Sequence, residues 1–221
     1  MPLQFDGTDD VVDHGDITAI NGASALTVAY VEEPDTLASA PRRRAAKGTT
    51  LTATLVISTV TNADRVAWSL DNMTNFAHLG SALSTGVSRH WLWVYDGTLA
   101  STNRVRCYRD GTEQALTFTG TIPTSIGTTT GAMQIGGHAT FTHADSMIGH
   151  VKIWSVALSS GEAAQEAQSF RPQRTANLLL WSPYHDGTVA ADYSGNGRHG
   201  TVTGALSTGS EIGAGFPVMV M

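Results

Sequence analysis

Two turn-rich motifs near opposite ends of the chain constrain its fold more than any other feature. The first, LQFDGTDDVVDHGD from Leu3, sets apolar residues on both sides of an acidic turn at residues 6–10. The second, ADYSGNGRHGTVTG from Ala191, sets a turn rich in Gly and Asn at residues 194–197 before a short strand. Gly supplies the positive φ of such turns, and Asp side chains cap their backbone amides. We predict that these motifs are the first and last elements of one closed β-sandwich.

Short strands and tight turns account for most of the remaining sequence. Turn pairs such as Asp96-Gly97 and Asp110-Gly111 separate the strand segments. Many strands without intervening helical periods favour an antiparallel sandwich closed by Greek-key connections. We therefore expect an all-β fold, an antiparallel jelly-roll β-sandwich with one short helix. The predicted strands, in which β-branched and aromatic residues alternate with small or polar ones, are residues 25–31, 51–60, 65–70, 89–95, 104–109, 114–118, 132–136, 147–155 and 177–181.

The helix is predicted at residues 160–169. Ser159 and Glu162 fit a capping box, in which the Ser side chain accepts from the third helical amide and the Glu side chain returns to the cap. Glu162 and Glu166 lie one turn apart, and we interpret them as a solvated face rather than an acid–base pair.

Residues 32–48, which contain Arg42, Arg43 and Arg44, are predicted to be an exposed loop. A phosphate contact or a protease site is the alternative interpretation of the three arginines.

Composition limits the kinds of partner. A chain of 221 residues with 41% hydrophobic content can bury a full core, and we predict a single domain over residues 1–221. The net charge of -6 argues against nucleic acid, because gripping a phosphate backbone takes clustered Lys and Arg. No apolar run is long enough to cross a bilayer, so no membrane insertion is expected. The lone cysteine, Cys107, is expected to be a buried small hydrophobe.

The motifs resemble those of a known family over nearly the whole chain. FDGTDDVV and SGNGRHGT are similar to motifs of the laminin-G-like branch of the concanavalin A-like jelly rolls. The run HWLWVYDG, then VRCYRDG, resembles the family's central hairpin, and MQIGG, MIGHVKIW and ALSSGE resemble its later segments. Family members commonly place the SGNG element before the FDG strand, whereas here it comes last, as in a circular permutation. Such a permutation costs little where the two elements lie side by side.

The resemblance implies a recognition module, and the sequence argues against an enzyme. Glycosidases on jelly rolls of this type need two carboxylates across one face of the sheet. The Glu residues, at positions 32, 33, 113, 162, 166 and 211, never alternate along a strand. We therefore expect no catalytic residues and rank a glycoside hydrolase last among the functions considered.

Acidic turns favour calcium as the metal, because Ca²⁺ takes several carboxylate and carbonyl oxygens. The first motif contributes Asp6, Asp9 and Asp10, followed by Asp13, and Asp192 with Asn196 is expected to face them. The alternative is that these side chains only cap turns. His138 and His143 are spaced too loosely to indicate a metal site.

Sugar binding in such sandwiches uses aromatic rings and hydrogen-bonding side chains on rim loops or on a sheet face. We predict Trp68, Tyr184, Tyr193 and Asn196 as the ligand-binding residues. Trp91, Trp93, Trp154 and Trp181 alternate within apolar strands and are expected to lie in the core.

Strand signals begin at residue 3, with no secretory leader before them, so we expect a virion surface component, a capsid decoration or tail appendage of a phage. Its partners would be other virion proteins or further copies of itself in a homo-oligomer, and surface glycans bound by weak multivalent contacts. The alternative is a free-standing calcium-dependent carbohydrate-binding module, extracellular or on a cell surface. The apolar tail, residues 212–221, is interpreted as the last strand of the sandwich or as a strand that docks on a neighbouring subunit.

Overall fold

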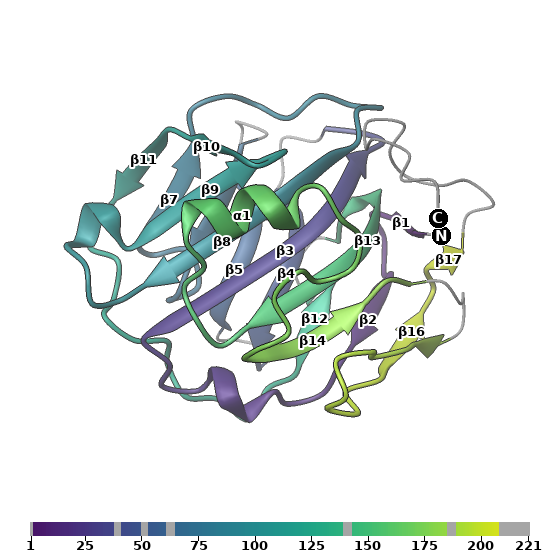
Figure 1. Cartoon of the computed structure of the whole chain (residues 1–221). Coiled ribbons are helices and arrows are strands. Elements are labelled where there is room, and N and C mark those ends of the chain that lie inside the picture. The colour runs from purple at the N-terminus through teal and green to yellow at the C-terminus, as the bar shows by residue number, and fades with distance from the viewer. Residues whose placement is uncertain are drawn as a thin grey trace.

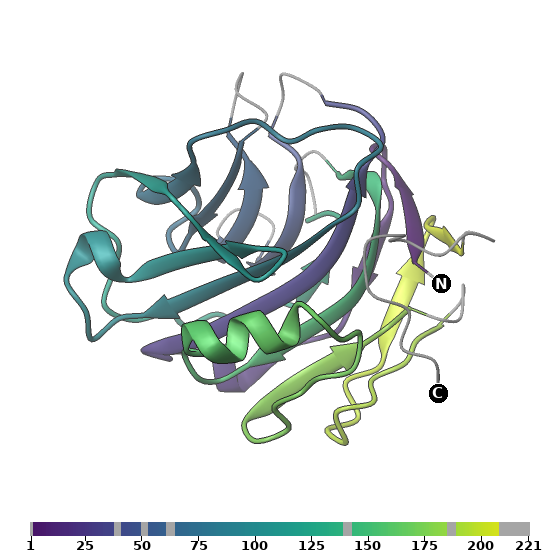
Figure 2. The ribbon, with the colours of Figure 1, turned by 45° about the horizontal axis from the view of Figure 1, so that its top comes forward.

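The computed structural model describes residues 2–37, 41–49, 53–60, 65–138, 143–184 and 189–207. Within these residues, two antiparallel sheets pack face to face, and one short α-helix lies against the outer face of one of them (Figures 1 and 2). The predicted all-β jelly-roll sandwich with one short helix is confirmed.

The first sheet supplies the strands on which most of the sites described below are built. Its central strands are β3, β8 and β13, which run through the middle of Figure 1. In spatial order it contains β10 (Thr112–Gln114), β9 (Val105–Arg109), β8 (Arg89–Asp96), β3 (Ala25–Pro34), β13 (Asp145–Trp154), β1 (Leu3–Asp6) and β17 (Leu206–Ser207), and β14 (Leu178–Ser182) also pairs with β13.

The second sheet closes the other side of the sandwich. In spatial order it contains β11 (Leu116–Thr119), β7 (Phe76–Leu79), β6 (Val66–Ser69), β5 (Ala53–Thr59), β4 (Arg43–Gly48), β12 (Met133–Ile135), β2 (Val11–Asp13), β16 (Gly200–Thr203) and β15 (Val189–Ala190). The helix α1 (Ser160–Glu166) and two short 3₁₀ turns, η1 (Thr18–Ile20) and η2 (Ser101–Asn103), complete the described elements.

Alternation along β8 divides its side chains between two apolar clusters. Trp91 and Trp93 face the core between the sheets, whereas Leu92 and Val94 face the second cluster, which packs beneath α1. Trp154 is buried in that outer cluster. The predicted burial of these three tryptophans is confirmed, and Cys107 is likewise buried.

The two end motifs lie side by side, as predicted. β2 of the first motif pairs with β16 of the second, with Val12 opposite Val202, and β1 pairs with β17. The chain therefore closes its sandwich by bringing residues about 190 positions apart in sequence into one ladder.

The helix begins with the predicted capping box. Ser159 accepts from the Glu162 amide, and the Glu162 side chain returns to the amide of Ser159. The predicted solvated face is wrong at Glu166, which is fully buried and lies 2.8 Å from Lys152 Nζ. The reason is that α1 packs on the first sheet, so this side of the helix faces β13 rather than water.

The predicted exposed loop at residues 32–48 is also wrong in large part. Glu32 belongs to β3, and residues 43–48 form β4, a buried strand. Arg44 Nε donates to Glu32 Oε1 across 2.8 Å, with both side chains almost fully buried. Arg44 and Glu32 fit inside because each is the opposite charge of the other, which spares the cost of burying an isolated ion.

One predicted strand is in fact two. Residues 114–118 change sheets at Ala115, so β10 lies in the first sheet and β11 in the second. No helix of the described residues is long and apolar enough to cross a membrane. The apolar tail at residues 212–221 lies outside the described residues.

Candidate functional site

The acidic turn, residues 6–10, connects β1 and β2 at one end of the sandwich. Gly7 takes a φ of +79°, which reverses the chain and brings three carboxylates together. Ligand oxygens of Asp6, Asp9 and Asp10 lie within 4.8 Å of one another. Asp6 and Asp9 are exposed and Asp10 is buried. This grouping has the oxygen chemistry that calcium prefers, although three carboxylates supply only part of its usual six to eight ligands.

The aspartate carboxylates of the turn also accept hydrogen bonds from its backbone amides. The Asp6 amide donates to Asp10 Oδ2 at 2.7 Å, and the Thr8 amide donates to Asp6 Oδ1 at 2.8 Å. Burial raises the pKa of the Asp10 carboxyl, and the nearby Asp6 and Asp9 carboxylates raise it further. A bound cation would offset that mutual repulsion. The arrangement is therefore compatible with both interpretations of the sequence, a calcium site and a set of turn caps.

Asp192 does not join this group. Among the described residues, the cluster of metal-ligating atoms contains the three aspartates of the acidic turn alone. Asp192 instead accepts from the backbone amides of Trp181, Ser194 and Arg198. Burial opposes its ionisation, yet these donors hold the pKa of Asp192 below its usual value. The prediction that Asp192 belongs to the metal site is wrong, because its oxygens accept hydrogen bonds that hold the turn at residues 194–197, which we call the C-terminal turn.

Asp13 and Asn196 are likewise engaged elsewhere. Asp13 lies on β2 and accepts from Gln134 of the neighbouring strand at 3.0 Å. The side-chain amide nitrogen of Asn196, Nδ2, donates to the carbonyl oxygens of Leu178 and Leu179 at 2.9 and 3.1 Å. Asn196 thus ties its turn to β14 through its side-chain nitrogen; the residue is exposed, and its role in ligand binding stays a prediction.

Two of the predicted sugar-binding aromatics are in the interior. Trp68 is fully buried between the sheets, where it stacks near Trp93 and Tyr95. Tyr184 is fully buried too, with its hydroxyl 3.3 Å from His14 Nε2. A ring without exposed surface offers no face to a sugar, so both residues are removed from the candidate set. The prediction for Tyr184 rested on its place near turn residues, outside a strand; the residue does follow the end of β14, and yet it is buried.

Tyr193 is the predicted aromatic that the fold does present to solvent. Its side chain is 57% exposed, and its ring tilts at 54° to Trp181 with 5.7 Å between centroids. The Tyr193 amide donates to the Trp181 carbonyl at 2.8 Å, which fixes the two residues together. Trp181, which we expected in the core, is only partly buried. We call Tyr193 and Trp181 the aromatic pair.

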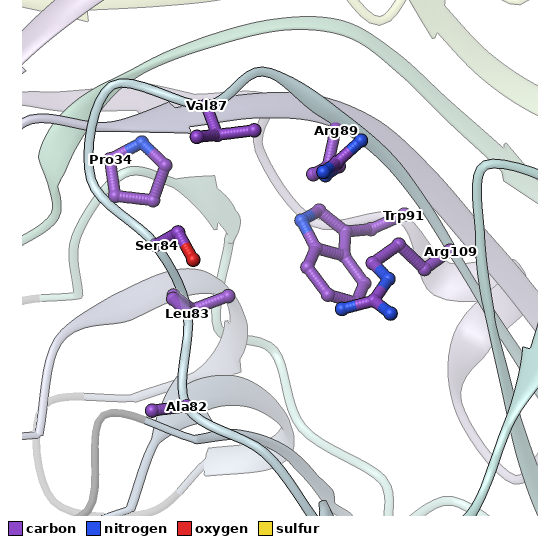
Figure 3. Close-up of a pocket in the computed structure, with 8 residues that line it drawn as sticks. All are labelled: Pro34, Ala82, Leu83, Ser84, Val87, Arg89, Trp91 and Arg109. Atoms are coloured by element: carbon purple, nitrogen blue, oxygen red, sulfur yellow. The ribbon is translucent and has the colours of Figure 1, made fainter.

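The structure also contains a small pocket at one end of the sandwich that was not predicted from the sequence. It lies between the loop that follows β7 and the adjoining ends of β8 and β9 (Figure 3). Trp91 was expected to lie in the core, and its side chain is indeed only 2% exposed. Its remaining surface, with Arg89 and Arg109, forms one wall. The sequence carries one local signal, the pairing of Arg89 and Trp91 on one face of a strand.

Comparison with known proteins gives one family. The family model described as the concanavalin A-like lectin/glucanases superfamily matches residues 6–164. The match therefore includes the acidic turn and stops before the C-terminal turn. A search of functionally curated proteins found no match.

Solved structures show the same fold at low sequence identity. A putative carbohydrate-binding protein from Bacteroides ovatus has a TM-score of 0.64 and 16% identity, over 93% of this chain and 59% of that chain. A heptameric SAP-like pentraxin from Limulus polyphemus has a TM-score of 0.57 and 14% identity, over 75% of this chain and 80% of that chain. Domain 4 of an extracellular arabinanase from Geobacillus stearothermophilus, solved with arabinotriose, has a TM-score of 0.51 and 12% identity, over 75% of each chain. At these identities the likeness concerns the fold.

Proposed function

Because the chain belongs to the concanavalin A-like lectin/glucanase superfamily, we propose that it is a non-catalytic module that recognises glycans. A fold alone does not fix a function, so the proposal must rest on a site. Of the similar structures, the Bacteroides protein is a putative carbohydrate-binding protein, and the arabinanase domain was solved with arabinotriose. These support the class of ligand that we propose here.

The aromatic pair is the observation that carries the proposal. Tyr193 stands out among the described residues as a large apolar side chain with more than half of its surface in solvent. A backbone hydrogen bond holds it against Trp181 without covering it. A fixed, amphipathic aromatic surface suits the C–H face of a pyranose ring, and the Tyr hydroxyl adds a hydrogen-bonding group. Exposing such a ring has no structural benefit that we can identify.

The non-catalytic part of the proposal is supported by what three glutamates of β3 and α1 do. Glu32 is paired with Arg44, and Glu166 with Lys152, each at 2.8 Å and fully buried. Glu162 caps α1 and contacts Arg174. These side chains serve the fold, which leaves them unsuited to protonating a leaving group.

Calcium at the acidic turn is a second part of the proposal. Its support is the closeness of the Asp6, Asp9 and Asp10 oxygens and the repulsion among them. Asp6 and Asp10 both accept hydrogen bonds from backbone amides of the turn, whereas the exposed Asp9 side chain takes no part in these bonds, so Asp9 is the best position at which to test this part.

We further propose display in several copies on a virion surface, as a capsid decoration or tail appendage. A shallow aromatic pair binds weakly on its own, and repeated copies raise the overall avidity. The alternative remains a free-standing calcium-dependent carbohydrate-binding module. Light scattering coupled to size exclusion, in calcium and in chelator, separates them: a defined oligomer supports display in several copies, and a calcium-stabilised monomer supports the alternative.

The glycan proposal is tested by a glycan array followed by calorimetric titration of the strongest neutral hit. Tyr193→Ala is expected to weaken binding by roughly tenfold, the size of one lost aromatic contact. Leu99→Ala is the matched control, because among the described residues Leu99 is the other large apolar side chain that is exposed, at 38%. Equal affinity of the Tyr193→Ala variant, or no binding to any glycan, would overturn the proposal.

A further inference from the structure

The arginine pocket, lined by Pro34, Ala82, Leu83, Ser84, Val87, Arg89, Trp91 and Arg109, occupies the open end of the sandwich. Trp91 lies directly opposite Arg109 in the β8–β9 ladder, and Arg89 lies two residues before Trp91. Side chains two residues apart share a face of a strand, so all three extend from the face that packs the core. At the strand ends that face meets solvent, and the pocket forms there.

The opposite wall comes from the loop after β7. In Figure 3, Leu83 and Ser84 face the indole of Trp91 across the hollow, with Pro34 and Val87 at its upper edge. The Gly86 amide donates to the Pro34 carbonyl at 2.8 Å, which anchors the loop to β3. The hollow itself holds about 40 Å³, and the space is about 350 Å³ when the open solvent at its mouth is included. The pocket is thus built by three strands of the first sheet and by the loop that leads into β8, and a backbone hydrogen bond anchors that loop.

Two arginine side chains, Arg89 and Arg109, give this pocket a positive charge. No ion pair between described residues involves Arg109, although its guanidinium lines the hollow. Arg89 lies 3.1 Å from Asp110, with both side chains nearly half exposed. An exposed pair of this kind contributes little and exchanges readily. One guanidinium without a carboxylate partner, and a second with a weak one, therefore face the same small hollow.

We propose that the arginine pocket binds the carboxylate of an acidic sugar. A guanidinium presents two parallel N–H donors that match a planar carboxylate, which a neutral sugar lacks. The indole edge of Trp91 and the apolar side chains of Leu83 and Val87 suit the C–H groups of the same ring. The Ser84 hydroxyl adds a donor and acceptor for a sugar hydroxyl. This inference rests on the proposed glycan-binding function and adds to it a ligand class and a second site.

Glucuronate and glucose make a direct test, because they differ in the carboxylate alone. The measurement is the ¹H–¹⁵N shift of the Trp91 indole during titration of the whole chain with each sugar. Glucuronate is expected to move this signal in a saturable way, and glucose is not. Arg109→Gln should weaken the glucuronate affinity by roughly tenfold or more, the loss of a charge-assisted bidentate contact. Arg109→Lys should restore it only in part.

Arg171→Gln is the control variant, because it removes the same charge from an exposed side chain in the segment after α1. It should leave the titration unchanged. Acetate and sulfate, at the concentrations used for glucuronate, test for a general anion site. Equal shifts with these ions, or an unchanged affinity in Arg109→Gln, would overturn the assignment to acidic sugars. No shift of the Trp91 signal with glucuronate would do the same.

The two sites have separate reporters. If the Trp91 signal stays still while a glycan moves the Trp181 signal, this inference fails and the proposed function stands. If glucuronate moves Trp91 but no glycan affects Trp181, the arginine pocket stands and the aromatic pair is wrong.

Discussion

A buried ion pair lies in the interior of this protein, and its two residues affect stability through each other. Arg44 and Glu32 meet between the two sheets, in a core that otherwise consists largely of apolar and aromatic side chains. A buried ion pair adds little net stability compared with apolar residues of the same size, but removal of one partner leaves an uncompensated charge. The pair is therefore a place where one substitution and two substitutions have different consequences.

We expect Arg44→Met to lower the free energy of unfolding by about 3–5 kcal/mol, because it strands the Glu32 carboxylate in the core. The double variant Arg44→Met with Glu32→Leu should recover most of that loss. Arg89→Gln, in the exposed pair with Asp110, should cost less than about 1 kcal/mol. Urea unfolding of the four proteins checks this. Equal losses in the single and double variants would show that the charges are not coupled.

His90 makes the stability depend on pH. Burial lowers the pKa of His90 to about 3, and Lys152 and His150 add to the lowering. In the unfolded chain His90 takes up its proton near pH 6.5, so between pH 6.5 and 3 the unfolded state binds the proton and the native state does not. The free energy of unfolding should therefore fall as the pH drops below 6.5, by up to about 1.4 kcal/mol per pH unit from this residue.

The His90→Leu variant tests the sign and the source of this dependence. Neither ring nitrogen of His90 has a hydrogen-bond partner in the described structure, so an apolar side chain replaces it without leaving a partner unpaired. Urea unfolding at pH 7 and pH 5 should show a smaller difference in the variant than in the original protein. The remainder is expected from His14 and His138, whose pKa values burial also lowers. If the difference in unfolding free energy between pH 7 and pH 5 is the same in both proteins, His90 is not the source of the pH dependence.

At the scale of elements, strands were predictable wherever apolar and small residues alternate. β3, β8, β9 and β13 therefore match the sequence prediction closely. β4 was missed because its alternation contains arginines and a lysine, whose partners lie on other strands and on the loop before η1. The capping box of α1 was predictable because all its atoms come from four consecutive residues.

The candidate sites divide in the same way. The acidic turn was found because its three aspartates lie within five residues. The arginine pocket was not, because its walls come from three separate segments of the chain. The inward turn of Tyr184 and the partial exposure of Trp181 depend on where β14 joins the sheet, which local periodicity does not contain.

The acidic turn is the element on which the calcium proposal depends. If the turn binds calcium, saturating Ca²⁺ should raise the melting temperature, because a ligand at 100 times its Kd adds about 2.7 kcal/mol of stability. A chelator should remove the increase, and Asp9→Asn should abolish most of it. Glu113→Gln, an equal charge loss at an exposed residue on β10, should leave it intact. Identical melting curves in calcium and chelator would reduce these aspartates to turn caps.

At the scale of the whole molecule, the order of the end motifs is the main departure from the family pattern. The ladder between β2 and β16 shows that the SGNG segment, although late in the sequence, lies beside the strand that follows the acidic turn. The family match ends at residue 164, so the aromatic pair belongs to the part of the chain beyond it. The proposed glycan surface is therefore a feature of this chain rather than one transferred from the family model.

The most direct test of the central claim is to map where a glycan touches the molecule. We would titrate the isotope-labelled chain with the neutral glycan ranked first on an array and follow its ¹H–¹⁵N signals. The account predicts the largest shifts at the Trp181 indole and at the amides of residues 193–197, with little change at Leu99. Saturable shifts confined to another face, or none at all, would contradict the assignment of glycan recognition to the aromatic pair.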